Sequence, residues 1–249
     1  MRFGSLFAGI GGFDAGLEAA GMECSWQVEI NSYATKVLEK HWPDVDRWTD
    51  VRTFPPPGEW FVDLICGGFP CQPCSVAGLR KGSNDERWLW PEFKRVCSIL
   101  RPKWLLAENV PGLLSAGDVP GELFGTILRD LAEIGYGYVE WDCIPAASLG
   151  ASHRRDRVWI VGVSDADNEG LEGRLFCGDS ARKQLARSRR KAEQETWRSN
   201  SRVLRVAHGV PSRVDRIKCL GNAVCPEVVE FIGKRIMEVE AKNCSTSSR

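Results

Sequence analysis

Short apolar runs alternate with longer amphipathic segments along the first two-thirds of the chain. Runs of this length are typical of buried strands, whereas apolar residues that recur every three or four positions predict helices. Strands and helices that alternate at this spacing predict βαβ units, and therefore an α/β fold with a doubly wound, mostly parallel sheet. The expected strands are 2–7, 24–28, 61–66, 104–107, 136–144 and 158–163, and the expected helices are 13–20, 31–41, 91–100, 121–134 and 226–239.

Turn residues mark the ends of several predicted helices. Gly21 and Gly135 directly follow two of them, at the position where glycine is favoured because it adopts the left-handed conformation without strain. Pro226 falls in the first turn of the last predicted helix, where proline is tolerated because its missing N–H would have no partner. These signals support the helix assignments independently of the apolar pattern.

The periodic pattern is lost between Ser164 and Ala207, where Gly, Ser, Arg and Glu dominate. We expect a small irregular second lobe there. The last residues, "NCSTSSR", are small and polar and predict a disordered end. The predicted organisation is one main domain formed by 1–163 and 219–241, a short basic region at 164–218 and a disordered tail at 242–249.

The formal net charge is zero, with 33 Lys and Arg against 33 Asp and Glu, but the charge is unevenly distributed. From Leu171 to Lys218 there are 13 Lys and Arg and only 5 Asp and Glu. A basic segment in an otherwise acidic chain is a plausible contact for a polyanion such as a nucleic acid. A solvated helix or loop explains the same composition equally well, so both interpretations stay open on composition alone.

The sequence contains neither an obvious membrane span nor an export signal. Its apolar stretches are far shorter than the roughly 20 residues that cross a bilayer, and its first residues lack the apolar core and cleavage site of a signal peptide. The ten cysteines are scattered over 249 residues, unlike the dense frameworks of small secreted domains. We therefore expect a cytoplasmic protein whose cysteines are mostly reduced.

Residues with chemical potential follow four predicted strands. In an open α/β sheet, ligands bind outside the carboxyl ends of the strands. These ends carry the glycine turn "AGIGG", then Glu29, then the loop "GGFPCQPCS" and finally Glu108. A glycine turn followed by an acid about 20 residues later resembles a nucleotide-binding pattern, but the full dinucleotide fingerprint fails because Asp14 replaces its third glycine. The pattern favours an adenosine-containing cofactor, although glycines needed only for packing explain the turn about as well.

The loop "GGFPCQPCS" places Cys71 and Cys74 three residues apart. This spacing is typical of thiol redox pairs, while a glycine- and proline-shaped loop also suits a single cysteine nucleophile. A zinc site is disfavoured, because there is no second cysteine pair and the three histidines are isolated. Redox chemistry, a nucleophile and two structural thiols remain about equally supported by the loop alone.

Glu108 and two arginines change this balance. A carboxylate at the end of an apolar strand is expected to be partly desolvated, which raises its pKa and lets it act as an acid. Arg155 and Arg157 are two residues apart on a predicted strand, so their side chains point to the same face. A strand-end acid that caps a turn, or arginines at a strand entrance, would each be ordinary alone. Together with Cys71 and the glycine turn, they indicate a group-transfer site.

The motifs that carry these residues resemble, in order, those of the DNA cytosine-5 methyltransferase family, in its phage and bacterial form. They are "FGSLFAGIGGFDAGLEAAG", Glu29, "TDV", "GGFPCQPCS", "ENV", "HRRDRVW" and "LGNAV". The resemblance implies a Rossmann-like fold, S-adenosylmethionine as cofactor and double-stranded DNA as partner of a monomer. It further implies catalytic roles for Cys71, Glu108, Arg155 and Arg157. The implied cofactor-binding residues are Phe7, Ala8, Gly9, Gly11, Glu29, Asp50, Val51, Pro70, Asn222 and Val224.

In the implied mechanism, the Cys71 thiolate adds to C6 of a flipped-out cytosine, and C5 then takes the methyl group. The region 164–218 corresponds to the family's target-recognition domain but is short, and Cys74 stands where the family often has phenylalanine. Such an enzyme would be solitary or paired with a restriction enzyme. The alternatives are the same chemistry on RNA, a non-catalytic nucleic-acid-binding relative and, least supported, a redox protein that uses Cys71 and Cys74.

Overall fold

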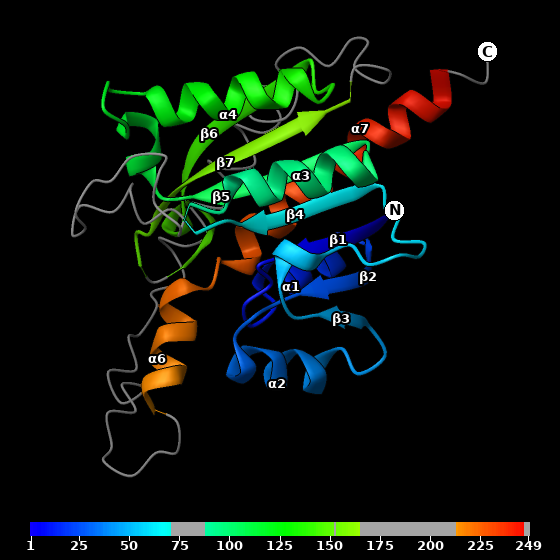
Figure 1. The fold of residues 1–249 in the computed structure, drawn as a ribbon, viewed down its shortest axis with the longest axis vertical. Helices are drawn as coiled ribbons and strands as arrows, with labels where there is room; N and C mark the ends of the chain where they lie inside the picture. Colours follow the sequence, from blue (N-terminus) through cyan, green and yellow to red (C-terminus); the bar gives the residue numbers. More distant parts are fainter. Residues whose placement is uncertain (71–87, 152, 165–212, 247–249) are drawn as a thin grey trace.

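The computed structural model describes residues 1–70, 88–151, 153–164 and 213–246. Its seven described strands form one sheet in the order β3-β2-β1-β4-β5-β7-β6 (Figure 1). Strands β1 to β5 pair in parallel, whereas β7 runs antiparallel between β5 and β6. The strands are β1 (Arg2–Leu6), β2 (Glu23–Val28), β3 (Asp46–Trp48), β4 (Leu64–Gly68), β5 (Trp104–Asn109), β6 (Tyr138–Pro145) and β7 (Asp156–Val163).

Helices cover both faces of this sheet (Figure 1). Side chains that alternate along each strand divide the interior into two cores. In β5, Leu105 faces the core beneath α3 and α4, and Leu106 faces the core beneath α1 and α7. The described α-helices are α1 (Gly12–Ala19), α2 (Ser32–His41), α3 (Trp90–Leu100), α4 (Glu122–Glu133), α6 (Arg213–Asn222) and α7 (Pro226–Thr246), and short 3-10 turns are η1 (Val51–Thr53), η4 (Pro111–Ser115) and η5 (Ala146–Leu149).

The first and last helices pack against each other through glycines. A Cβ atom added to Gly16 of α1 would lie 2.5 Å from Cβ of Val229 in α7. Similarly, a Cβ atom on Gly233 of α7 would lie 2.8 Å from Cβ of Ala20. Such distances are too short for real side chains, so glycine at these positions allows the two backbones to approach. This contact brings the end of the described chain back to the glycine turn at its beginning.

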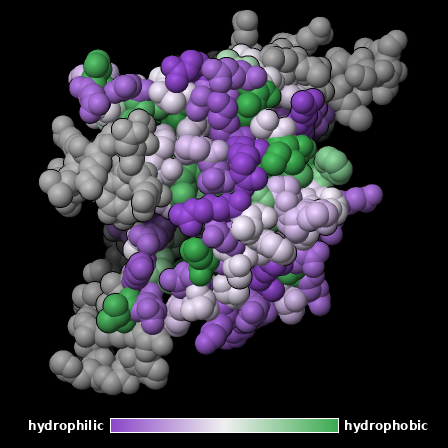
Figure 2. Space-filling model, in the orientation of Figure 1, coloured by the Kyte–Doolittle hydropathy of each residue, from purple (hydrophilic) through white to green (hydrophobic). Residues whose placement is uncertain are grey.

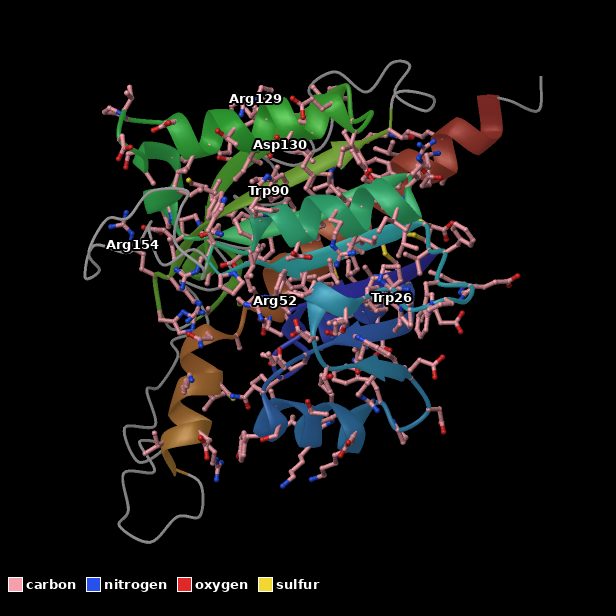
Figure 3. All side chains as sticks on the ribbon, in the orientation of Figure 1. Trp26, Arg52, Trp90, Arg129, Asp130 and Arg154 are labelled. Carbon is pink, nitrogen blue, oxygen red and sulfur yellow. The ribbon has the colours of Figure 1, made fainter. Side chains whose placement is uncertain are left out.

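Polar side chains join the two helices on the opposite face. Trp90 and Lys94 of α3 both donate to the carboxylate of Asp130 in α4, each over 2.8 Å (Figure 3). The outer surface of this layer is mostly hydrophilic, and its apolar residues are scattered in small groups (Figure 2). The α3–α4 layer is therefore an ordinary solvent-facing layer. The candidate site residues lie instead at the edge of the sheet.

The predicted doubly wound, mostly parallel sheet is confirmed, and the main differences lie at element boundaries. The strand expected at 61–66 begins only at Leu64, and Phe61 is 66% exposed. The last helix continues to Thr246 rather than ending at Val239, so residues 242–246 of the tail that we expected to be disordered are helical. Strand β3 and helix α6 were not predicted, because β3 has only three residues and two of these are charged, and α6 begins within the basic region 164–218, to which no helix was assigned.

Several predictions concern residues outside the described part of the chain. These are Cys71 and Cys74 and most of the basic region 164–218. Six cysteines are free thiols in the structure, namely Cys24, Cys66, Cys97, Cys143, Cys219 and Cys225. Within the same residues, no group of His, Cys, Asp and Glu is arranged to hold a metal ion. None of the described helices has the length and apolarity needed to span a membrane.

Candidate functional site

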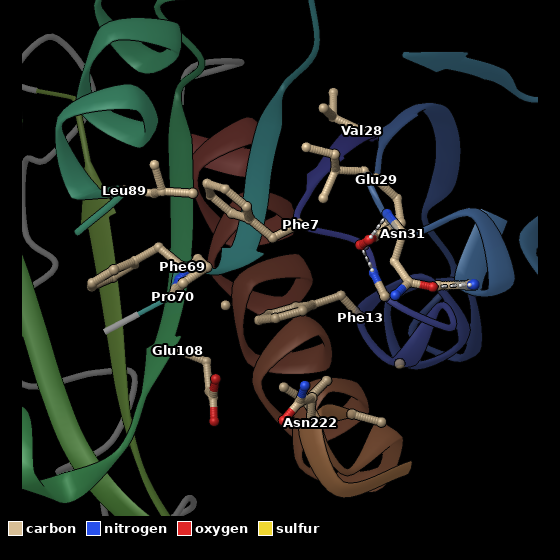
Figure 4. Close-up of a pocket in the computed structure, with 18 of the residues that line it drawn as sticks. Phe7, Phe13, Val28, Glu29, Asn31, Phe69, Pro70, Leu89, Glu108 and Asn222 are labelled. Atoms are coloured by element: carbon tan, nitrogen blue, oxygen red, sulfur yellow. Dashed lines mark hydrogen bonds between the residues drawn. The ribbon is translucent and has the colours of Figure 1, made fainter. Parts of the chain in front are cut away.

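A cavity of about 600 Å³ opens at the carboxyl edge of the parallel strands (Figure 4). All four loops that the sequence singled out contribute to it. They are the turn after β1, Glu29 after β2, the segment from Gly68 to Pro70 after β4, and Glu108 at the end of β5. A cavity of this volume is in the range that accommodates a nucleoside-sized ligand.

The turn after β1 has an unusual backbone. Phe7, Gly9 and Gly11 all adopt the left-handed region, with φ angles of 54°, 58° and 85°. For glycine this conformation is unstrained, whereas for a bulky residue such as phenylalanine it costs about 1–3 kcal/mol and is often found at functional sites. The result is that the Phe7 side chain borders the cavity next to the glycine turn (Figure 4).

Glu29 ties the glycine turn to the start of α2. One carboxylate oxygen accepts a hydrogen bond from the backbone N–H of Gly9, and the other accepts one from the N–H of Asn31, both over 2.7 Å. The Asn31 side chain in turn caps α2 by accepting from the N–H groups of Tyr33 and Ala34. Each oxygen of an ionised carboxylate has two lone pairs, so Glu29 retains capacity to accept from the hydroxyl groups of a ligand.

Asp50 and Val51 form the next part of the wall. Asp50 accepts a hydrogen bond from the backbone N–H of Arg52 at the start of η1, and its carboxylate lies 3.6 Å from the Arg52 guanidinium. Both charged side chains are partly exposed, so this ion pair contributes little to stability. Val51 is buried beneath them. Asp50 therefore presents an acceptor at a solvent-accessible part of the cavity.

Glu108 is a buried acid paired with an arginine. The antiparallel register places Glu108 opposite Trp159, so Arg157, two residues before Trp159, is its diagonal neighbour on the same face. The Nε atom of Arg157 lies 2.8 Å from the Glu108 carboxylate. Burial raises the pKa of Glu108 to about 7, although the charges of Arg157 and Arg155 oppose this shift. The acid can therefore gain and lose a proton near neutral pH.

Gly68 leaves room for this carboxylate. It is the register partner of Glu108 on the neighbouring strand, and a Cβ atom on Gly68 would lie 2.9 Å from an oxygen of Glu108. Any larger residue would therefore displace the acid from its position in the cavity.

Asn109 holds the backbone that leads to Cys71. Its side-chain amide donates to the carbonyl of Phe69 over 2.9 Å, and its side-chain oxygen accepts from the N–H of Val110. Asn109 is only 4% exposed, so these bonds form in a dry environment, where losing one is costly. This contact fixes the chain two residues before Cys71.

The segment between α6 and α7 closes the cavity on the remaining side. Asn222 and Val224 both line it. Arg155 supports this segment from outside, because its guanidinium donates to the carbonyl of Gly221 over 2.9 Å. Arg155 also has a left-handed backbone, with a φ angle of 36°, and burial lowers the pKa of its guanidinium.

The structure thus brings most of the predicted site residues around one cavity, with two differences. Gly11 and Arg155 are not part of the cavity wall: Gly11 faces the ring of Trp42, and Arg155 contacts Gly221. The predicted residues that line the cavity are Phe7, Ala8, Gly9, Glu29, Asp50, Val51, Pro70, Glu108, Arg157, Asn222 and Val224.

Sequence reasoning missed other residues of the wall. Asn109 belongs to the motif "ENV" but was assigned no role, and Asn31 was expected only as the first residue of a helix. Their positions next to Glu108 and Glu29 were the signal that would have found them. The additional wall residues include Gly12, Phe13, Asn31, Arg52, Phe69 and Asn109.

The sheet order and the strand-edge cavity define a doubly wound α/β fold with a nucleoside-sized site. The family model of the C-5 cytosine-specific DNA methylases matches residues 1–205 of this chain. Because the match covers most of the chain, the protein belongs to this family. The resemblance inferred from the motifs is therefore confirmed.

Curated relatives are bacterial methyltransferases that are longer than this chain. The type II methyltransferase M.HgiBI of Herpetosiphon aurantiacus is 37% identical over 171 residues, which cover 66% of this chain and 37% of the relative. M.NgoMIV of Neisseria gonorrhoeae is 38% identical over 172 residues, which cover 66% of this chain and 53% of the relative. The matched part of this chain thus spans between about a third and a half of the length of these two relatives.

Solved structures share the fold. A crystal structure described as a prophage-encoded DNA modification methyltransferase (E. coli) superimposes with a TM-score of 0.57 and 26% identity, covering 71% of this chain and 50% of that one. A Spodoptera frugiperda DNMT2 variant gives a TM-score of 0.56 at 21% identity, covering 69% of this chain and 52% of its own. The latter supports the fold alone.

Proposed function

We propose that this protein is a DNA cytosine-5 methyltransferase that transfers a methyl group from S-adenosylmethionine to C5 of a flipped-out cytosine. The observation that carries the proposal is a buried acid–arginine pair, Glu108 and Arg157, in the same cavity as the glycine turn and Glu29. The backbone that enters this cavity at Pro70 continues directly into Cys71. The proposal thus combines a cofactor end and a reaction end within one cavity.

The residues of the cofactor end fit S-adenosylmethionine. Glu29 has lone pairs left for the ribose hydroxyls, and Phe7 offers an aromatic ring against which adenine would stack. Asp50 and the backbone of Val51 would accept and donate hydrogen bonds at the adenine edge. Ala8, Gly9, Pro70, Asn222 and Val224 would complete the wall, and Gly11 would act indirectly through the shape of the turn. When bound, the cofactor supplies an electrophilic methyl group.

The reaction end would make cytosine reactive enough to take that group. In the proposed sequence, the Cys71 thiolate would form a bond to C6, while Glu108 donates its proton to N3, which takes up the electron density that C6 addition pushes into the ring. Arg157 holds Glu108 and faces the O2 side of the base, and Arg155 supports the cavity wall at Gly221. C5 would then form the bond to the methyl carbon while the methyl–sulfur bond breaks and S-adenosylhomocysteine leaves. Loss of the C5 proton to solvent and of the thiolate from C6, with return of the N3 proton to Glu108, would restore the aromatic ring and free Cys71.

The proposed substrate is double-stranded DNA, bound by a monomer in the cytoplasm of a bacterial or phage-infected cell. The basic region 164–218 would contact phosphates, so binding should weaken steeply as salt increases. Relatives named as type II methyltransferases support an association with restriction-modification. A salt-independent affinity would argue against this role of the basic region.

The direct test is methyl transfer from labelled S-adenosylmethionine to unmethylated duplex DNA, followed by bisulfite sequencing of the product. The proposal predicts 5-methylcytosine at a defined sequence, and none with Cys71→Ala. Cys74→Ala is the matched control, and it should retain activity. Methylation of RNA but not DNA would shift the assignment to an RNA enzyme, and binding without transfer to either polymer would identify a non-catalytic relative.

A further inference from the structure

A chain of hydrogen-bonded polar side chains that do not line the cavity connects the start of α1 with β2 and β3. The carboxylate of Asp14, on the first turn of α1, accepts from the amide of Gln27 over 2.8 Å and from the hydroxyl of Ser5 over 3.2 Å. Asp14 and Gln27 are completely buried. None of the chemistry proposed above uses these groups. Their burial nevertheless costs free energy, which the hydrogen bonds between them must offset.

The chain continues from Gln27 to the end of α2. The side-chain oxygen of Gln27 accepts from Nε of Arg47 in β3 over 3.0 Å. The Nη2 atom of Arg47 then donates to the backbone carbonyls of Leu38 and Trp42. The Gln27 amide thus links a guanidinium to a carboxylate.

Trp42 returns this chain to the glycine turn. A Cβ atom added to Gly11 would lie 2.3 Å from the Trp42 ring, so the ring packs directly on the Gly11 backbone. The Trp42 indole also donates to Glu18 of α1 over 2.8 Å. Asp14, Gln27, Arg47 and Trp42, here called the buttress, therefore form a closed loop of contacts that begins and ends on the first turn of α1.

Each element of the buttress also carries a residue of the cavity wall. Gln27 precedes Glu29 by two residues at the end of β2, and Arg47 precedes Asp50 by three residues after β3. A shift of β2 relative to α1 would therefore move the carboxylate of Glu29 away from the N–H of Gly9, and a shift of β3 would move Asp50. Because hydrogen bonds weaken steeply with distance and angle, even small shifts of these strands would change the geometry of the cavity wall.

We propose that the buttress residues Asp14, Gln27 and Arg47 are positioning residues that hold the glycine turn, Glu29 and Asp50 in the geometry that binds the cofactor. This inference rests on the proposed function, because it takes the nucleoside end of S-adenosylmethionine as the ligand. It goes beyond that function by assigning a role to residues that do not touch the cavity.

The test uses calorimetric titration of the ligand-free protein with S-adenosylhomocysteine. Gln27→Leu removes the amide link at similar size, and the dissociation constant should rise about tenfold. Tyr136→Phe is the matched control: it removes a buried hydrogen bond of 2.7 Å to the Pro102 carbonyl in the other core, and its affinity should stay within about twofold of the wild type. Amide hydrogen exchange of residues 8–12 should be faster than in the wild type in Gln27→Leu, but not in the control Tyr136→Phe.

A conservative pair separates positioning from simple packing. Asp14→Asn keeps an oxygen that accepts from Gln27 and an amide that reaches Ser5, so its affinity should stay within about threefold of the wild type, whereas Asp14→Leu should lose about tenfold. If Gln27→Leu does not fold, Arg47→Met provides the same comparison, because the Arg47 side chain is partly exposed. Unchanged affinity and exchange in these variants would overturn the inference and leave the proposed function intact. No binding of S-adenosylhomocysteine to the wild type would overturn both.

Discussion

The pKa of Glu108 leads to a specific prediction about stability. Between about pH 4.5 and pH 7, the folded protein keeps a proton on Glu108 that the unfolded chain releases, because burial raises the pKa of this acid to about 7. When the folded state binds more protons, the free energy of unfolding falls as pH rises. The loss across the whole window is about 3 kcal/mol, since one pH unit corresponds to about 1.4 kcal/mol.

Glu108→Gln isolates this contribution. The variant keeps the shape of the side chain and an oxygen that accepts from Arg157, but it does not titrate. We expect urea unfolding at about pH 5 and about pH 8 to show wild type losing about 2–3 kcal/mol more than the variant, because part of the window lies below pH 5. Subtracting the two profiles removes the contribution of every other titrating group. Parallel profiles would refute the argument, and the opposite slope would mean that Arg157 outweighs burial.

Arg157→Gln provides a companion measurement. The guanidinium of Arg157 opposes the effect of burial on the pKa of Glu108. Without it, the protonated form should persist to higher pH, so the stability loss should extend above pH 7. An unchanged window would show that the two side chains interact more weakly than their 2.8 Å separation indicates.

Three further predictions concern the packing around the site. Gly68→Ala should leave the free energy of unfolding nearly unchanged but reduce methyl transfer, because its Cβ would lie 2.9 Å from an oxygen of Glu108; full activity would contradict this. Asn109→Leu should lower the free energy of unfolding by about 1–3 kcal/mol in urea unfolding, because the buried carbonyl of Phe69 loses its donor. Asn109→Asp also lacks the donor and should therefore not restore the stability of the wild type. Gly16→Val should lower the free energy of unfolding by at least about 1–3 kcal/mol, because it pushes α1 away from α7. A decrease in melting temperature smaller than that of Gly16→Ala would be inconsistent with this packing.

Much of the cavity could be predicted from the sequence, for a geometric reason. In a parallel sheet, the carboxyl ends of the strands meet at one edge. Glu29 and Glu108 follow apolar runs that are easily recognised as strands, so their convergence with the glycine turn required no knowledge of tertiary contacts. The same reasoning located the segment from Gly68 to Pro70.

The remaining features depend on contacts between distant residues. Gly11 belongs to the glycine turn, yet its position against Trp42 depends on how α2 ends. Arg155 was expected beside Arg157 on one strand face, but it precedes the strand in a left-handed conformation and contacts Gly221. Helix α6 begins within the basic region 164–218, to which no helix was assigned, and its residues Val214 and Leu220 are both exposed. Local pattern therefore had no information about these features.

The central claim is tested most directly by trapping the covalent step. Duplex DNA with 5-fluorocytosine at the target cannot lose the group at C5 as a proton, so the bond from Cys71 to C6 should persist after methyl transfer. We predict a denaturation-resistant protein–DNA complex that requires S-adenosylmethionine, forms with wild type and Cys74→Ala, and is absent with Cys71→Ala. A complex that forms through Cys74, or a catalytically active protein that forms no complex, would contradict the account.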